Sequence, residues 1–80
     1  MTRNEFREAV EKEGLSHLGI EFDLVRSRED GWIVTRTGER GELYLISLHA
    51  SEEEGLDALL GEMRNRKEHN RILKKIRSGN

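Results

Sequence analysis

The chain contains no cysteine and no proline, and aromatic residues make up only 5% of its 80 positions. Without cysteine it can form no disulfide framework, no CxxC redox pair and no zinc site built on thiolates. No apolar run approaches the ~20 residues that a membrane-spanning helix needs, and no secretory hydrophobic segment follows Met1. We therefore expect a cytoplasmic protein that has no membrane partner.

The sequence is also short of core-forming residues. Hydrophobic side chains make up 34% of it and charged side chains 38%, whereas the apolar share of a typical globular domain, glycine included, is about 45–50%. A domain of this size can hardly give up core to a deep substrate cavity. We therefore expect residues 1–80 to form a single domain that acts through its surface.

Short motifs mark the two ends of a first helix. Thr2 and Glu5 have the T-x-x-E spacing of a capping box, in which the hydroxyl and the carboxylate accept hydrogen bonds from otherwise unpaired backbone N–H groups. Gly14 can adopt the left-handed conformation that follows the last helical residue. The motifs predict a helix over residues 3–13.

Three strands are predicted next. Residues 18–26 alternate between apolar and other side chains, which is typical of a half-buried strand. Turn signals at Asp30-Gly31 and at residues 38–41 separate it from β-prone segments at 32–37 and 42–49. Connections this short make the strands antiparallel neighbours in a meander. The third strand is expected to divide its side chains between two faces: Tyr44, Ile46 and Leu48 on one, and Leu43, Leu45 and Ser47 on the other.

Trp32 opens the second of these strands. Its neighbours do not indicate which face is inward, because Trp32 shares its side with Val34 while Ile33 lies on the other. A core position is the more frequent fate of a single tryptophan, and a binding anchor on an open face is the alternative.

A second helix begins with another capping box, formed by Ser51 and Glu54, and its pattern continues to about residue 77. One apolar stripe should cover the sheet: Leu56, Leu59, Leu60 and Met63. A second stripe falls on nearly the opposite side of the helix: Ile72, Leu73 and Ile76. A kink near residues 65–70 could return the second stripe to the first helix, or a straight helix could present it to a second copy or another protein. Fraying of the helix end is the third alternative. The fold class is α+β, in the order α-β-β-β-α, with the helices on one face of a three-stranded antiparallel sheet.

Charge is divided unevenly along the chain. Residues 1–63, the acidic body, hold 15 acidic and 7 basic residues, whereas residues 64–80, the basic segment, hold 1 acidic and 7 basic residues. The basic side chains are Arg64, Arg66, Lys67, Arg71, Lys74, Lys75 and Arg77. Such a segment could follow a nucleic-acid backbone, bind an acidic patch on a protein, or pair with the acidic body. Cations also suit the negative end of a helix without any partner.

The acidic body has a candidate surface of its own. Its carboxylates cluster around the start of the second helix and the turn before the third strand: Glu52, Glu53, Glu54, Asp57, Glu62, Glu39 and Glu42. Carboxylates on a rigid face can imitate nucleic-acid phosphates and occupy a basic groove of a protein. Capping and solubility account for the first-turn glutamates equally well.

No arrangement in the sequence predicts catalysis, a metal or a cofactor. His17, His49 and His69 lack the i, i+4 spacing and the HExxH pattern of helical metal sites. A zinc site from His17, His49 and a carboxylate would need the fold to bring them together. Gly38 and Gly41 belong to a hairpin turn, because the lysine and the following helix of a phosphate loop are missing. The sequence therefore predicts a protein that is not an enzyme.

The layout as a whole resembles a family of known inhibitors. A capped helix, a meander ending in Glu42-Leu43-Tyr44-Leu45-Ile46-Ser47, and a long helix opening with Ser51-Glu52-Glu53-Glu54 are similar to some small phage-encoded anti-CRISPR and other anti-defence proteins. The resemblance implies a small acidic domain, in the cytoplasm of a phage host, that blocks a nucleic-acid-binding effector. The basic segment departs from a uniformly acidic mimic, and the resemblance carries over no individual residues.

Two functions therefore remain as hypotheses. The first is a non-enzymatic protein-binding module, a stoichiometric inhibitor of a large nucleic-acid-handling protein. The alternative is a small nucleic-acid-binding regulator that uses the basic segment. A homodimer through Ile72, Leu73 and Ile76 is compatible with both.

Overall fold

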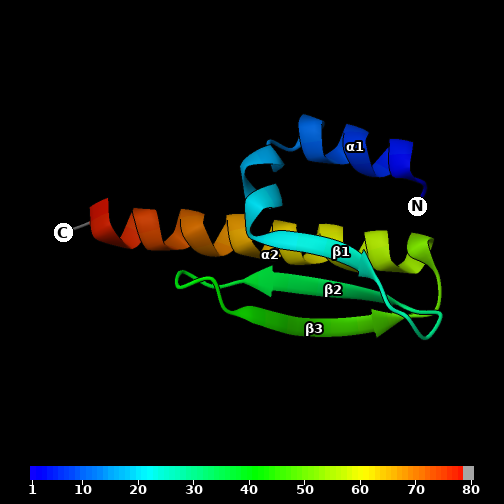
Figure 1. Ribbon diagram of the computed structural model, residues 1–80. Helices are drawn as coiled ribbons and strands as arrows, with labels where there is room; N and C mark the ends of the chain where they lie inside the picture. Colours follow the sequence, from blue (N-terminus) through cyan, green and yellow to red (C-terminus); the bar gives the residue numbers. More distant parts are fainter. Residues whose placement is uncertain (79–80) are drawn as a thin grey trace.

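The computed structural model describes residues 1–78 and confirms the predicted order of elements (Figure 1). Helix α1 (Arg3–Lys12) is followed by the short 3-10 helix η1 (Ser16–Ile20), strands β1 (Phe22–Arg26), β2 (Trp32–Thr37) and β3 (Leu43–His49), and helix α2 (Glu52–Ser78). The strands form one antiparallel sheet in the order β1-β2-β3. The α+β fold is thus the one that the sequence indicates.

The signals at both ends of α1 act as predicted. The Thr2 hydroxyl accepts a hydrogen bond from the Glu5 N–H at 3.2 Å, and the Glu5 carboxylate accepts one from the Thr2 N–H at 2.9 Å. Gly14 has a φ of 67°, the left-handed conformation that favours glycine. This turn directs Leu15 back into the core, where it is fully buried.

The prediction that the first strand begins at residue 18 is wrong. Residues 16–20 form η1, and the strand begins only at Phe22. Leu15 and Leu18 are both buried, and their spacing of three suits a 3-10 turn, in which residues i and i+3 lie above one another. Ile20, which the alternation placed beside Leu18, is 91% exposed.

The predicted faces of the third strand are also wrong, because β3 contains an irregularity. Thr35 pairs with Leu45, but its neighbour Val34 pairs with Ser47, so Ile46 is an extra residue on β3. A bulge of this kind shifts the alternation beyond it by one position. Leu45 therefore shares a face with Leu48, while Ser47 shares the covered face with Val34.

The core lies between the sheet and the first half of α2. The predicted stripe of Leu56, Leu59, Leu60 and Met63 is buried, and three of these residues join one cluster with Leu15, Leu18, Phe22 and Val34. Gly55 allows the close approach, since a Cβ atom there would lie 2.7 Å from Leu24 Cδ1 and 3.4 Å from Trp32 Cβ. Trp32 is half-buried on this covered face.

Helix α2 is continuous from Glu52 to Ser78, so the kink, one of the alternatives that the sequence left open, is absent from it. The segment 64–71 lacks aliphatic residues, but it also lacks proline and glycine, so nothing in it breaks a helix. The C-terminal end of α2 extends beyond the sheet (Figure 1). Ile72, Leu73 and Ile76 are consequently 47%, 39% and 60% exposed.

Candidate functional site

The first part of the basic segment is bound to the acidic body. The Nε and Nη2 groups of Arg64 donate to the Glu13 carboxylate, at 2.7 and 2.6 Å, and the Lys67 amino group donates to the Glu13 backbone carbonyl. The hydrogen bond from Arg64 holds the pKa of Glu13 below its ordinary value. These contacts fasten the end of α1 to the middle of α2, so Arg64 and Lys67 have a structural role.

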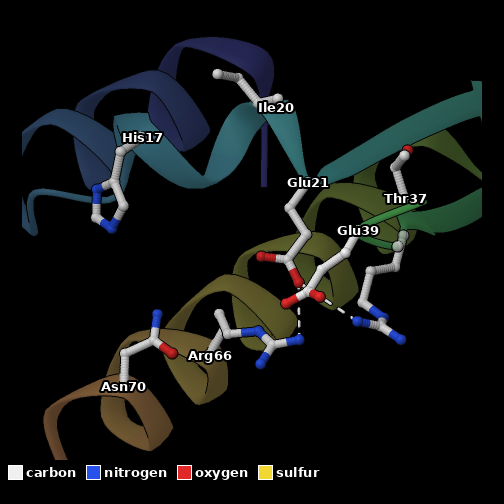
Figure 2. Close-up of a pocket in the computed structure, with 9 residues that line it drawn as sticks. His17, Ile20, Glu21, Thr37, Glu39, Arg66 and Asn70 are labelled. Carbon is white, nitrogen blue, oxygen red and sulfur yellow. Dashed lines mark hydrogen bonds and ion pairs between the residues drawn. The ribbon is translucent and has the colours of Figure 1, made fainter. Parts of the chain in front are cut away.

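Arg66 belongs to a second ion-pair cluster, which lines a cleft of about 520 Å³ (Figure 2). Its guanidinium lies 2.7 Å from the Glu21 carboxylate, which also lies 3.5 Å from Arg36. Glu39 approaches the same cluster from the β2–β3 turn in Figure 2. Each positive group faces a carboxylate, so the cleft presents balanced charge rather than a site for an anion.

The other predicted basic residues lie on the far half of α2. Arg71 is paired with Glu68 on the preceding turn, at 2.5 Å, and this contact raises the pKa of Arg71 and lowers that of Glu68. Lys74, Lys75 and Arg77 are exposed, and the last two lie in the final turn. The basic segment is therefore not one continuous surface. Of its predicted range, residues 79–80 lie outside the described residues.

The predicted acidic cluster is likewise divided. At the start of α2, Glu52 accepts two hydrogen bonds from Arg3, at 2.9 and 2.6 Å, and Asp57 pairs with the amino group of Met1 at 3.0 Å. These contacts hold the start of α1 against α2. Glu53 and Glu54 beside them are exposed.

Three further predicted carboxylates lie away from that end. Glu39 and Glu42 belong to the β2–β3 turn, at the opposite end of the sheet from the start of α2 (Figure 1). Glu42 accepts hydrogen bonds there from the Arg40 N–H and the Tyr44 hydroxyl. Glu62 lies between these two groups, along α2. The seven carboxylates therefore do not form one face.

The structure also keeps the two candidate zinc-binding histidines apart. His17 lies on η1, near the beginning of β1, whereas His49 ends β3 beside Trp32 and forms a 2.7 Å hydrogen bond with Ser47. Within residues 1–78, no group of three or more His, Cys, Asp or Glu side chains is arranged to hold a metal ion.

A cleft and, beyond it, an exposed apolar stripe follow one side of α2. A cleft of about 340 Å³ separates α2 from β3, and Ile46 and His69 lie on its two sides. Ile72, Leu73 and Ile76 continue the His69 side of α2 by one to two turns, past the end of the sheet. We call these five residues the α2–β3 groove. The sequence identified its helical part, but not the contribution of Ile46, because the bulge in β3 is a feature of strand pairing.

A second apolar surface lies on the side of the sheet away from both helices. Pairing places Val25, Ile33 and Leu48 in one row across the three strands, with Leu45 and Leu43 in the next rows. We call these five residues the open sheet face. Leu45 and Leu48 are 69% and 70% exposed. Sequence reasoning missed this surface because it assigned Leu45 and Leu48 to opposite faces.

Comparison of the chain with protein-family models, with curated proteins and with solved structures finds no match. In the part of the chain that the structure describes, no helix combines the length and apolar character needed to cross a membrane. The chemistry of the surfaces is therefore the basis for any functional inference.

Proposed function

We propose that this chain is a non-catalytic protein-binding module and that the α2–β3 groove is its docking surface. The observation that carries the proposal is the exposed stripe of Ile72, Leu73 and Ile76 on a helix that is continuous with the core. A helix extension in water needs no aliphatic side chains, and clustered ones on a surface are typical of interaction sites.

The groove is suited to a protein segment rather than to a small molecule. It is open along α2, and its apolar residues are bordered by charged and polar side chains: Arg36, Glu62, Asn65 and Arg66. Apolar anchors within a polar rim are the usual anatomy of a protein interface. The exposed stripe would be covered only by a partner that extends past the end of the sheet.

We further propose that the partner is a nucleic-acid-handling protein and that the chain inhibits it in a one-to-one complex, in the manner of anti-CRISPR and anti-defence proteins. The support is electrostatic: residues 1–63 hold 15 acidic and 7 basic residues, and Glu53 and Glu54 at the start of α2 are exposed. A protein that binds nucleic acid presents positive charge where it does so, and that region would face Glu53 and Glu54, whereas the stripe in the basic segment would dock outside it.

The test is a comparison of three immobilised proteins in a nuclease-treated cell lysate. The wild type is compared with the pair Ile72→Glu and Ile76→Glu, which disrupts the groove, and with the pair Glu53→Gln and Glu54→Gln, which reduces the acidic charge. We expect mass spectrometry to identify one protein that the groove variant loses and the glutamine variant retains weakly. Adding the wild-type chain to that protein should abolish its nucleic-acid binding at an equimolar ratio.

Two results would refute this function. One is a set of captured proteins that is the same for the wild type and the groove variant. The other is a captured protein whose nucleic-acid binding is unchanged by a molar excess of the chain. Circular dichroism of the three proteins controls for folding, because all four substituted side chains are exposed or partly exposed.

A second function, nucleic-acid binding by the basic segment, is favoured by the exposure of Lys75 and Arg77 on the projecting turns of α2. Against it, Arg64, Arg66 and Lys67 contact carboxylate or carbonyl oxygens of the body. Phosphate contacts would make the logarithm of the binding constant fall steeply with the logarithm of salt concentration. A titration of the chain with duplex and single-stranded DNA at several salt concentrations separates this function from the first.

A further inference from the structure

We infer that the open sheet face joins two copies of this chain into a face-to-face dimer. Helices α1 and α2 both pack on the other side of the sheet, and within residues 1–78 no element covers the row of Val25, Ile33 and Leu48 (Figure 1). Leu45 and Leu48 are exposed by more than two thirds. A second layer on this face would remove these side chains from water, which is the main driving force of association.

The near-absence of charge on the open sheet face favours a second copy of the chain as its occupant. In a two-fold symmetric interface each surface meets itself, so any concentration of one charge would face the same charge. Strand positions on this face carry a single ionisable side chain, Asp23, among the described residues. The Asp23 carboxylate turns back to accept a hydrogen bond from the Leu24 N–H at 2.8 Å.

The apolar stripe on α2, in contrast, is surrounded mostly by charge of one sign. Ile72, Leu73 and Ile76 lie in the basic segment, which holds 7 basic residues and 1 acidic residue. Two such segments side by side would repel each other. A homodimer through this stripe, one of the sequence-based hypotheses, is therefore less favourable than one through the open sheet face.

The geometry of the face is compatible with sheet-on-sheet packing. Two twisted sheets pack with their strands about 30° apart and about 10 Å between layers, and their side chains interdigitate. From the ~4.8 Å strand spacing and the ~3.4 Å rise per residue, the three strands offer a footprint of roughly 300 Å². This is small beside the ~800 Å² of accessible surface that each partner contributes to a standard interface. We therefore expect a weak dimer that forms only at high protein concentration.

Dimerisation would leave the helical part of the proposed docking surface free. Ile46 borders clefts on both sides of the sheet, but Ile72, Leu73 and Ile76 lie on α2, on the side away from the open sheet face. The inference does not depend on the proposed function, and a monomeric variant that still binds the partner would separate the two.

Sedimentation velocity of the full chain from low micromolar to near millimolar concentration tests the inference. We expect a shift from monomer to dimer in the wild type, and a dissociation constant raised at least ~100-fold by Leu45→Glu, because each substitution occurs twice in a symmetric dimer. Ile76→Glu is the matched control on α2 and should leave the dissociation constant unchanged. Circular dichroism at low concentration verifies that both variants fold.

A second measurement needs no substitution. In a mixture of isotope-labelled and unlabelled full-length chains, isotope-filtered NMR should give contacts between the methyl groups of Leu45 and Leu48 in different copies. A wild type that stays monomeric up to the highest concentration would overturn the inference. A dimer that survives Leu45→Glu would also overturn it, and would indicate pairing along the β3 edge instead. A dimer that is lost with Ile76→Glu would overturn it as well.

Discussion

Leucines on α2 have different roles according to their position. Leu60 is fully buried against the sheet, whereas Leu73, thirteen positions further along the same helix, is 39% exposed and belongs to the α2–β3 groove. The same residue type in the same secondary structure therefore supports folding at one position and is available for binding at the other.

Substitution of these two leucines separates the two roles. Leu60→Ala should lower the free energy of unfolding by about 2–5 kcal/mol, because it removes buried methyl groups and leaves a cavity. Leu73→Ala should lower it by about 1 kcal/mol or less, since that side chain is already partly in water. Urea unfolding of both variants measures the difference. Equal losses would mean that the projecting part of α2 contributes to the core as much as the covered part.

At the scale of the elements, capping motifs located the starts of the helices, but the alternation of side chains did not locate the start of β1 or the faces of β3. The capping boxes at Thr2 and Ser51 predicted where both helices begin, since each motif contains its own hydrogen-bonding partners. The sequence could not locate the bulge between Leu45 and Ser47, because a bulge depends on which residues of β2 lie opposite. The composition of the groove and the open sheet face depended on that bulge, so both sites were only partly predictable.

The close packing of α2 against the sheet can be tested at two glycines of the helix. A Cβ atom at Gly61 would meet nothing within 4 Å, so Gly61→Ala should raise the free energy of unfolding by about 0.5–1 kcal/mol through helix propensity. Gly55→Ala is the matched control, because its Cβ atom would lie 2.7 Å from Leu24 and the collision should cancel the gain. Thermal unfolding measures both. A gain at Gly55 as large as that at Gly61 would show that α2 is not held closely against the sheet there.

At the scale of the whole molecule, charge segregation has an internal function. Two ion pairs join the basic segment to the acidic body, Arg64 to Glu13 and Arg66 to Glu21. A third, Arg3 to Glu52, joins the two helices within the acidic body. The sequence suggested such pairing as one of several uses of the basic segment, but it could not show which cations take part. Only the fold brings Glu13 and Glu21 beside α2.

These ion pairs predict a loss of stability in acid. The hydrogen bonds from Arg64 and Arg3 hold the pKa values of Glu13 and Glu52 below their ordinary value. The unfolded chain therefore takes up protons first, so the stabilisation is fully present above about pH 4.3, the usual pKa of glutamate, and is lost as the pH falls through the lower folded values.

The measurement is urea unfolding of the wild type and of Glu13→Gln between pH 7 and pH 3. The wild type should be the more stable protein at neutral pH, and the difference should shrink toward the acid end of the range. A difference that does not change with pH would mean that the Glu13–Arg64 contact contributes through packing and not through charge.

Because α2 is continuous, the direction in which Ile72, Leu73 and Ile76 point is fixed relative to the core. Because one helical screw runs from Glu52 to Ser78, each residue turns the chain by about 100° and advances it by about 1.5 Å. Lengthening the segment between Met63 and Ile72 by one residue would swing the stripe by more than a quarter turn, away from Ile46, without altering any of its side chains. Lengthening it by seven residues would nearly restore the direction of the stripe and move it about 10 Å further along the helix axis. The direction of the stripe thus depends on the number of residues between Met63 and Ile72 and not on the identity of any one of them.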